Sequence, residues 1–197
     1  MSDAPRITPG TRREIGFVAT GFSNVAGRVM GTNPPHIFRT LARTKTLFWG
    51  WLIFAGRLMP GGKLSRRQSE LVILRVAGLR GSEYELVQHR LMGRRVGLTP
   101  DEIERAESGS NEDWSSSDLA LLQAADMLIA DKDLTDERWD QLRAEFNERT
   151  CIEFLMLAGH YDLLATVLGT LRVQPDVPRG RRMAREVRGR ELCARGR

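Results

Sequence analysis

Apolar residues recur every three or four positions along most of the chain, the spacing that places them on one face of an α-helix. From Pro34 the pattern predicts a short helical region carrying Ile37 and Leu41, and then a strongly apolar helix over residues 48–58 that Pro60 ends. No segment alternates apolar and polar residues with the two-residue period of a strand. The pattern therefore predicts an all-α fold.

Three pairs of residues spaced three apart have the capping-box pattern that marks helix starts. They are Ser65–Gln68, Ser82–Glu85 and Thr99–Glu102. Gly81 is expected to end the helix that the first pair opens, because glycine readily takes the left-handed conformation found after helix C-termini. The remaining expected elements are a polar loop over 108–117 and helices over 118–130, after Thr135 and over 151–171. Together these signals predict about seven to eight helices.

A length of 197 residues with 41% hydrophobic and 28% charged residues is typical of a single globular domain with its own core. The first 33 residues are rich in Gly, Thr and Arg and are expected to form an irregular N-terminal arm. Residues 34–173 form the predicted helical domain, and residues 174–197 an Arg-rich C-terminal tail.

The most apolar stretch without a charge, Thr46–Gly56, is well short of the roughly 20 residues that cross a bilayer. The N-terminus has no apolar segment of the kind found in secretory signals. We therefore expect a cytoplasmic protein without a membrane partner.

Positive charge is concentrated near the C-terminus. Residues 179–197 hold eight Arg and two Glu, a net charge of +6, whereas the whole chain carries +5, so residues 1–178 together are close to neutral. The tail contains no aromatic residue on which a base would stack, and attraction to phosphates alone gives only nonspecific binding. We expect a solvated or subunit-contacting tail and no nucleic-acid partner.

The two cysteines, Cys151 and Cys193, are too far apart in the sequence to form a C-x-x-C redox pair. Cys151 lies in an apolar run and is expected to be a buried, inert thiol. Cys193 is expected to be a free thiol in the tail.

The segment 64–106 resembles the carboxymuconolactone decarboxylase and alkylhydroperoxidase-D-like family. The resemblance rests on Glu70 in one helix, the turn at Gly81, His89 in the next helix and the continuation GLTPDEI from Gly97 to Ile103. It extends more weakly over residues 34–173. It implies a helical domain of the alkylhydroperoxidase-D-like type that forms a homo-oligomer, a trimer or hexamer, with the helix over 151–171 packed between subunits.

In the peroxidase branch of this family, two cysteines stand where this chain has Ser82 and Glu85. A thiol peroxidase needs one thiolate to attack the peroxide and a second thiol to resolve the product. Neither serine nor glutamate does this, so a divergent alkyl hydroperoxide peroxidase is the weakest functional hypothesis.

The decarboxylase branch has the form E-L-x-x-H in the second helix, which this chain matches from Glu85 to His89. The resemblance implies a lyase or isomerase of aromatic compound catabolism that acts on a small cyclic or aromatic-derived carboxylic acid or lactone. Loss of CO2 leaves a carbanion or dienolate that must be stabilised and protonated. A histidine is suited to donate that proton near neutral pH.

Three side chains are therefore candidate catalytic residues, His89, Glu85 and Glu70. Glu85 and His89 are four residues apart, so they share a helix face and can form a hydrogen-bonded acid–base pair. Glu70 precedes the run LVIL, so its carboxylate is expected in an apolar setting. Tyr84 and Ser82 are candidate substrate-binding residues, Ser82 because a helix N-terminus favours anions.

Each of these residues also has a structural interpretation. Ser82 and Glu85 are accounted for by a capping box, and Glu70 by an ion pair with Arg66 or Arg67. His89 is equally compatible with a satisfied core histidine. Glu85 and His89 are half of a metal site, but with only three His in the chain no further ligand cluster is apparent, and neither a metal nor another cofactor is expected.

The triplet His160, Tyr161 and Asp162 interrupts the apolar run of residues 151–171. Polar residues on a buried helix form either a hydrogen-bonded cluster, here between subunits, or the wall of a pocket. We favour the hydrogen-bonded cluster.

The leading hypothesis is thus an acid–base enzyme that uses His89 with Glu85 and Glu70. The alternative is a noncatalytic helical oligomer that binds a ligand or partner.

Overall fold

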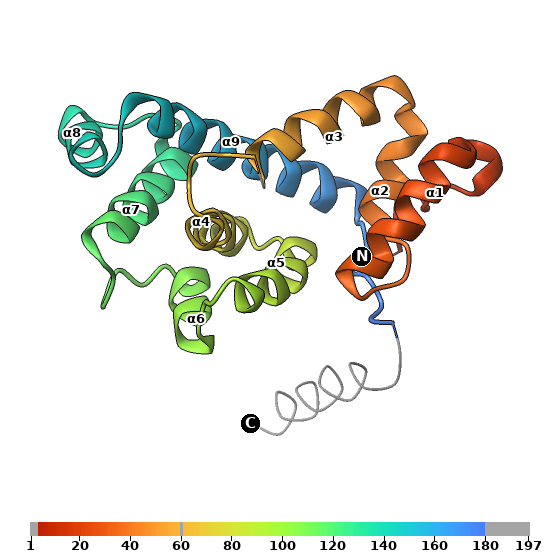
Figure 1. Cartoon of the computed structure of the whole chain (residues 1–197), viewed down its shortest axis with the longest axis horizontal. Helices are drawn as coiled ribbons and strands as arrows, with labels where there is room; N and C mark the ends of the chain where they lie inside the picture. The colour runs from red at the N-terminus through yellow and green to blue at the C-terminus, as the bar shows by residue number, and fades with distance from the viewer. Residues whose placement is uncertain (1–3, 60, 180–197) are drawn as a thin grey trace. The chain divides into compact units, whose positions relative to one another are not determined.

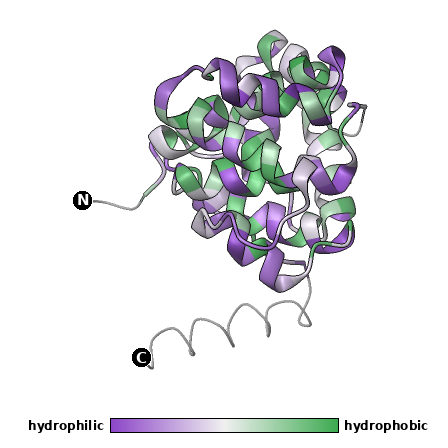
Figure 2. Ribbon diagram, turned by 90° about the vertical axis from the view of Figure 1, so that its left-hand side faces the viewer, coloured by the Kyte–Doolittle hydropathy of each residue, from purple (hydrophilic) through white to green (hydrophobic). Residues whose placement is uncertain are grey.

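The computed structural model describes residues 4–59 and 61–179. Within these residues it contains nine α-helices, one short 3-10 helix and no strand, so the all-α prediction is confirmed and the helix count is slightly higher than expected. The elements are α1 (Arg12–Met30), α2 (His36–Leu41), the 3-10 helix η1 (Ala42–Thr44), α3 (Thr46–Leu58), α4 (Arg66–Leu79), α5 (Glu83–Arg95), α6 (Pro100–Ser108), α7 (Ser116–Asp131), α8 (Asp136–Glu145) and α9 (Glu148–Leu171) (Figure 1). In the hydropathy colouring of Figure 2, the helices carry both hydrophobic and hydrophilic segments, as expected for helices with one buried and one exposed face.

The described residues form two compact units, which we treat separately. The core unit contains Gly50–Arg172, and the N-terminal unit contains Pro5–Trp49 together with residues 173–179. The predicted division at residues 33 and 174 remains a prediction, and most of the Arg-rich tail, including Cys193, lies outside the described residues.

Helix α4 is the centre of the core unit. Nine consecutive residues, Ser69–Ala77, are buried, because α4 packs against α5, α6, α7 and α9. Figure 1 views α4 nearly end-on with these four helices around it. Gly78 permits the close approach of α6, since a Cβ atom there would lie 2.3 Å from the carbonyl oxygen of Glu107.

Arg75 is the largest fully buried side chain of α4. Its Nη2 donates hydrogen bonds of 2.8 Å to the carbonyl oxygen of Ser110 and to Oδ1 of Asn111. The guanidinium therefore fixes the loop between α6 and α7, which the sequence predicted as a polar loop.

The longest helix, α9, buries one face and exposes the other. Ile152, Met156 and Leu163 are 59%, 48% and 61% exposed. By length and hydropathy α9 also passes as a candidate membrane span, and half of its most apolar window is buried inside the fold. Counting only uncharged residues overlooks this helix because it contains Glu153 and Asp162.

The prediction of an irregular N-terminal arm is wrong over Arg12–Met30, which form α1. Thr11 and Glu14 make a capping box at its start, and the buried residues Ile15, Ala19, Ser23 and Gly27 recur every four positions. Most of these residues are small, so the hydrophobic signal in the sequence is weak. The N-terminal unit packs α1 against α2 and η1, and Phe22 contacts the rings of Phe38 and Phe48 edge-on.

Candidate functional site

The turn between α4 and α5 sets the geometry of the candidate site. Gly81 has a φ of +59°, the backbone N–H of Gly81 donates to the carbonyl of Gly78, and that of Ser82 donates to the carbonyl of Ala77. This pair of hydrogen bonds is the Schellman motif that ends many helices. Gly81 is therefore the residue that stops α4, as predicted.

The predicted capping box at Ser82 and Glu85 does not form. Ser82 precedes α5 with a ψ of 86° and its side chain caps no backbone N–H, whereas Ser65 and Thr99 form complete boxes with Gln68 and Glu102. The reason is that the Ser82 N–H completes the end of α4, which holds Ser82 away from the usual extended cap conformation. Glu85 is thus not needed as a capping residue.

Glu70 and His89 form a buried pair between α4 and α5. The Nδ1 atom of His89 lies 2.6 Å from Oε2 of Glu70, and Nη2 of Arg66 donates to Oε1 of Glu70 at 2.8 Å. Glu70 is completely buried and His89 is 6% exposed. The predicted ion pair of Glu70 with Arg66 is therefore confirmed, and the same carboxylate also contacts His89; the catalytic role of Glu70 stays a prediction.

This pairing defines the state of the imidazole. An ionised carboxylate only accepts hydrogen bonds, so Nδ1 of His89 must be the donor. The Nε2 atom is then the nitrogen that is left to take up or release a proton, as in other carboxylate–histidine pairs. The expected hydrogen bond between Glu85 and His89 is not formed, because His89 turns its Nδ1 toward Glu70.

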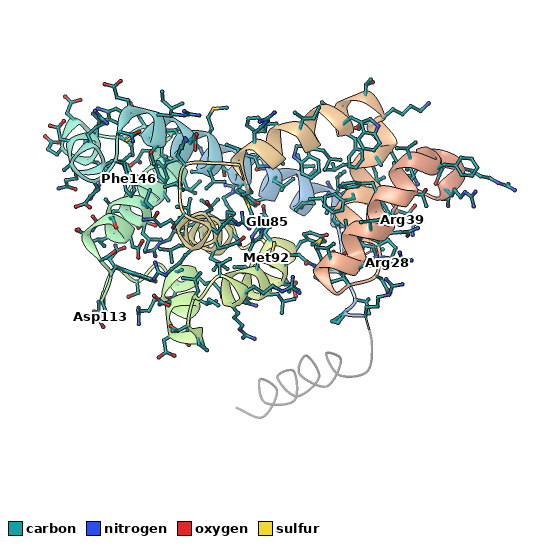
Figure 3. All side chains as sticks on the ribbon, in the orientation of Figure 1. Arg28, Arg39, Glu85, Met92, Asp113 and Phe146 are labelled. Carbon is teal, nitrogen blue, oxygen red and sulfur yellow. The ribbon has the colours of Figure 1, made fainter. Side chains whose placement is uncertain are left out.

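Glu85 is the most unusual group of the site. It is 2% exposed, and neither carboxylate oxygen has a hydrogen-bond partner among the described residues. Burial raises the pKa of Glu85 to about 7, while Ser82 and His89 oppose the rise and Asp162 adds to it. The Ser82 hydroxyl lies near enough to influence this pKa without completing a hydrogen bond of ordinary geometry. Figure 3 labels Glu85 on α5, among the helices of the core unit.

Tyr161 of α9 brings these groups together. Its ring meets the ring of His89 edge-on, with centroids 5.1 Å apart, and its hydroxyl lies 2.9 Å from the sulfur of Met59, to which it donates. Burial raises the pKa of the Tyr161 phenol well above its usual value, and the charges of Glu70 and Glu85 raise it further while Arg66 opposes them. The phenol therefore lies close enough to Glu70, Glu85 and Arg66 to feel their charges.

The triplet in α9 separates into three different environments. His160 packs against the rings of Trp51, Phe54 and Tyr161, and burial lowers the pKa of His160 to about 4. Asp162 forms ion pairs with Arg80 and Lys132 at 3.0 and 2.9 Å. The triplet is not one hydrogen-bonded cluster within the chain, and its expected role between subunits stays a prediction.

The structure brings together Glu70, His89 and Glu85, and it buries Tyr84 and Ser82 at the start of α5. Sequence reasoning missed one neighbour of His89, the ring of Tyr161, whereas it offered the ion pair of Arg66 with Glu70 as a structural interpretation. Arg66 was visible as an i,i+4 neighbour of Glu70. Nothing local in the sequence indicates that α9 places Tyr161 against α5.

The other chemistry that the sequence raised is that of metals and thiols. Across 4–59 and 61–179, no group of three or more His, Cys, Asp or Glu side chains is placed to hold a metal ion. Cys151 is a free, fully buried thiol whose sulfur lies 3.7 Å from the carbonyl oxygen of Phe146. Its surroundings fit the expected inert thiol.

The part of the chain that carries the site is similar to a known protein family. Residues 45–114 match the carboxymuconolactone decarboxylase family, and this segment contains α4, α5 and the pair of Glu70 with His89. No curated protein matches the chain.

Solved structures give the fold. A peroxidase-related protein from Silicibacter sp. TM1040 is 18% identical with a TM-score of 0.73, and the match covers 88% of this chain and 90% of that one. The alkylhydroperoxidase core of a peroxidase-related protein from Ralstonia eutropha JMP134 is 17% identical with a TM-score of 0.74, covering 86% and 92%. The debrominase Bmp8 is 14% identical with a TM-score of 0.73, covering 88% and 94%.

These similarities agree with the helical architecture. Residues 45–114 therefore belong to the carboxymuconolactone decarboxylase family, and the chain around them has the alkylhydroperoxidase-D-like fold.

Proposed function

We propose that the protein is an acid–base enzyme of the carboxymuconolactone decarboxylase type that acts on a small cyclic or aromatic-derived carboxylic acid or lactone. The observation that carries the proposal is the buried carboxyl group of Glu85, which has no hydrogen-bond partner among the described residues and a pKa of about 7. A buried polar group without a partner destabilises a fold, and such groups with shifted pKa values are concentrated at functional sites.

The pair of Glu70 and His89 supplies the second half of the chemistry. Glu70 orients the imidazole through Nδ1, so Nε2 is available to exchange a proton with the substrate. Glu85 lies one turn before His89 on the same helix, and with a pKa of about 7 its carboxyl group is suited to act as a proton source near neutral pH.

In the proposed reaction, the bond between the ring and the substrate carboxylate breaks and CO2 leaves. The electron pair enters the conjugated ring system, and His89 delivers a proton from Nε2 to carbon. Glu85 then returns a proton to His89 and is itself reprotonated from water. The reaction needs no electron donor or acceptor, so proton transfer is balanced by the two side chains and solvent.

Arg66 is proposed to hold the substrate carboxylate. One terminal nitrogen, Nη2, is engaged by Glu70, whereas Nη1 is buried without a hydrogen-bond partner among the described residues. A guanidinium binds carboxylates well because its N–H groups match their two oxygens. Ser82 and Tyr84 are proposed to contact the rest of the substrate. Solvent does not reach the oxygens of Glu85, so entry of a substrate has to displace neighbouring side chains.

The test is release of CO2 from carboxymuconolactone and from a panel of small cyclic and aromatic carboxylic acids. We expect turnover by the wild-type protein, with kcat reduced roughly 100-fold or more in His89→Ala, which is the usual contribution of a general acid or base. The pH profile of kcat/KM should show an ionisation near pH 7, which Glu85→Gln should remove.

His36→Ala is the matched control. His36 belongs to the N-terminal unit, where its Nδ1 contacts the carbonyl oxygen of Gln174, so this variant should keep full turnover. Unchanged turnover in His89→Ala would overturn the mechanism. Binding of the acids without any CO2 release would instead support the noncatalytic oligomer.

A further inference from the structure

Helix α1 exposes its large apolar residues. Phe17, Val18, Val25 and Val29 are 71%, 74%, 56% and 72% exposed. The buried face of the same helix is made largely of the small residues Ala19, Ser23 and Gly27. This distribution is the reverse of that in an ordinary surface helix, where the large apolar side chains face the core.

Three of these exposed residues form an apolar stripe along α1. Val18, Val25 and Val29 are separated by seven and four positions, so they lie above one another on the same face of α1. Arg28 adjoins the stripe and is also exposed, and Figure 3 labels it on α1. Exposed apolar residues that gather on one face of a helix are typical of an interaction surface.

The unit that carries this stripe is strongly basic. Residues 5–49 contain seven Lys and Arg and a single acidic residue, Glu14. Glu14 is paired with Arg43 at 2.8 Å, whereas Arg13 and Arg28 are exposed and form no ion pair with any described residue. Residues 50–172 have the opposite balance, with 15 basic and 20 acidic residues.

The sequence adds further positive charge to the same unit. Residues 180–197 contain seven Arg and two Glu, and the chain enters this segment from residues 173–179 of the N-terminal unit. The near neutrality of residues 1–178 therefore conceals a basic N-terminal part and an acidic core unit.

From this combination we infer that the N-terminal unit binds the surface of an anionic lipid bilayer, with α1 lying in the interface. The apolar stripe enters the boundary between headgroups and acyl chains, and Arg13, Arg28 and the Arg-rich tail attract anionic headgroups. Stable attachment to a membrane surface generally needs two such signals, an apolar element and a basic segment. The expectation of no membrane partner rested on the absence of a spanning segment, which a surface-bound helix does not need.

Two other occupants fit the surface less well. A nucleic acid offers phosphates for the arginines but nothing apolar for three aligned valines. A second copy of the chain, paired through α1 about a twofold axis, places the same basic faces against each other. An anionic lipid surface satisfies both the charge and the apolar stripe.

The experiment is cosedimentation of the full-length protein with large unilamellar vesicles. One set contains phosphatidylcholine alone and the other contains phosphatidylcholine with about one third phosphatidylserine, a composition rich enough in anionic lipid to attract basic segments. We expect binding only to the second set, and weaker binding as salt is raised. Arg28→Gln should reduce the affinity about fivefold, the effect typical of one basic residue near a charged surface. Val18→Glu should reduce it by roughly tenfold or more.

Val177→Glu is the control, because Val177 is an exposed valine of the same unit (56%) that lies outside α1. It introduces the same charge and should change binding far less than Val18→Glu. Val25→Glu repeats the test at a second position of the stripe, and circular dichroism checks that each variant keeps its helix content. Equal binding to both vesicle sets, no binding to either, or equal losses in Val18→Glu and Val177→Glu would each overturn the proposal. So would a solution dimer that Val18→Glu dissociates, or duplex RNA binding that Val18→Glu leaves intact while vesicles are not bound.

Discussion

At the scale of single residues, Glu85 is a buried carboxylate to which no described neighbour donates a hydrogen bond. The capping-box pattern offered its carboxylate a backbone partner, but the Ser82 N–H is used to end α4. The side chain is therefore buried without a hydrogen bond to any described residue. The structural interpretation of Glu85 as a capping residue is therefore wrong, because the sequence pattern cannot tell which of two adjacent helices uses a shared N–H, and its catalytic role stays a prediction.

The protonation state of Glu85 is the first prediction. We expect the C=O stretch of a protonated carboxyl group in infrared difference spectra of the wild-type protein, with a titration midpoint near pH 7, because burial without a partner favours the neutral form. Glu85→Gln should remove this band. A midpoint near 4.5, the ordinary value for glutamate, would show that the carboxyl is solvated in solution.

At the scale of helices, the helix starts and ends were predictable where the residues that form them lie within one turn of each other. Ser65 and Thr99 cap α4 and α6 as expected, and Gly81 ends α4. Helix α1 was missed because its buried stripe is mostly small and its apolar residues face outward. A periodic hydrophobic pattern is normally taken to mark the buried face of a helix. In α1 the large apolar residues are exposed, so the pattern does not indicate which face is buried.

The Gly81 turn gives a prediction at this scale. Gly81 has positive φ and open space where the Cβ atom of an alanine would lie, so Gly81→Ala should cost about 1 kcal/mol of unfolding free energy through backbone strain alone. Gly159 lies inside α9 with equally open space, so the same substitution there should stabilise the protein by about 0.5–1 kcal/mol. Urea denaturation of both variants measures the difference, and effects of the same sign would contradict the conformational argument.

At the scale of the whole chain, the site depends on contacts that no local pattern encodes. Helix α4 carries Glu70, α5 carries His89 and Glu85, and α9 carries Tyr161. The family resemblance supplied the first two helices because their residues are close in the sequence. Tyr161 lies 72 positions after His89, and only the packing of α9 against α4 brings its ring to the histidine.

The pH dependence of stability also belongs to this scale, because two buried groups in the core unit titrate in opposite senses. The pKa of Glu85 is raised from 4.5 to about 7, so its favourable contribution is present below pH 4.5 and is lost as pH rises through 7. The pKa of His160 is lowered from 6.5 to about 4, so its contribution is present above pH 6.5 and is lost as pH falls through 4. Each shift corresponds to a free energy on the order of 3 kcal/mol.

Between these limits the two contributions offset each other, and we expect the wild-type free energy of unfolding to vary little from these groups between about pH 4.5 and 6.5. In Glu85→Gln only the contribution of His160 remains, so the free energy of unfolding should rise with pH across this window. His160→Phe keeps an aromatic ring against Trp51 and Phe54. In this variant only the contribution of Glu85 remains, so the free energy of unfolding should fall with pH. Chemical denaturation at a series of pH values measures all three slopes. Parallel curves for the three proteins would mean that neither group is buried in solution as it is here, and the acid–base role of Glu85 would lose its physical basis.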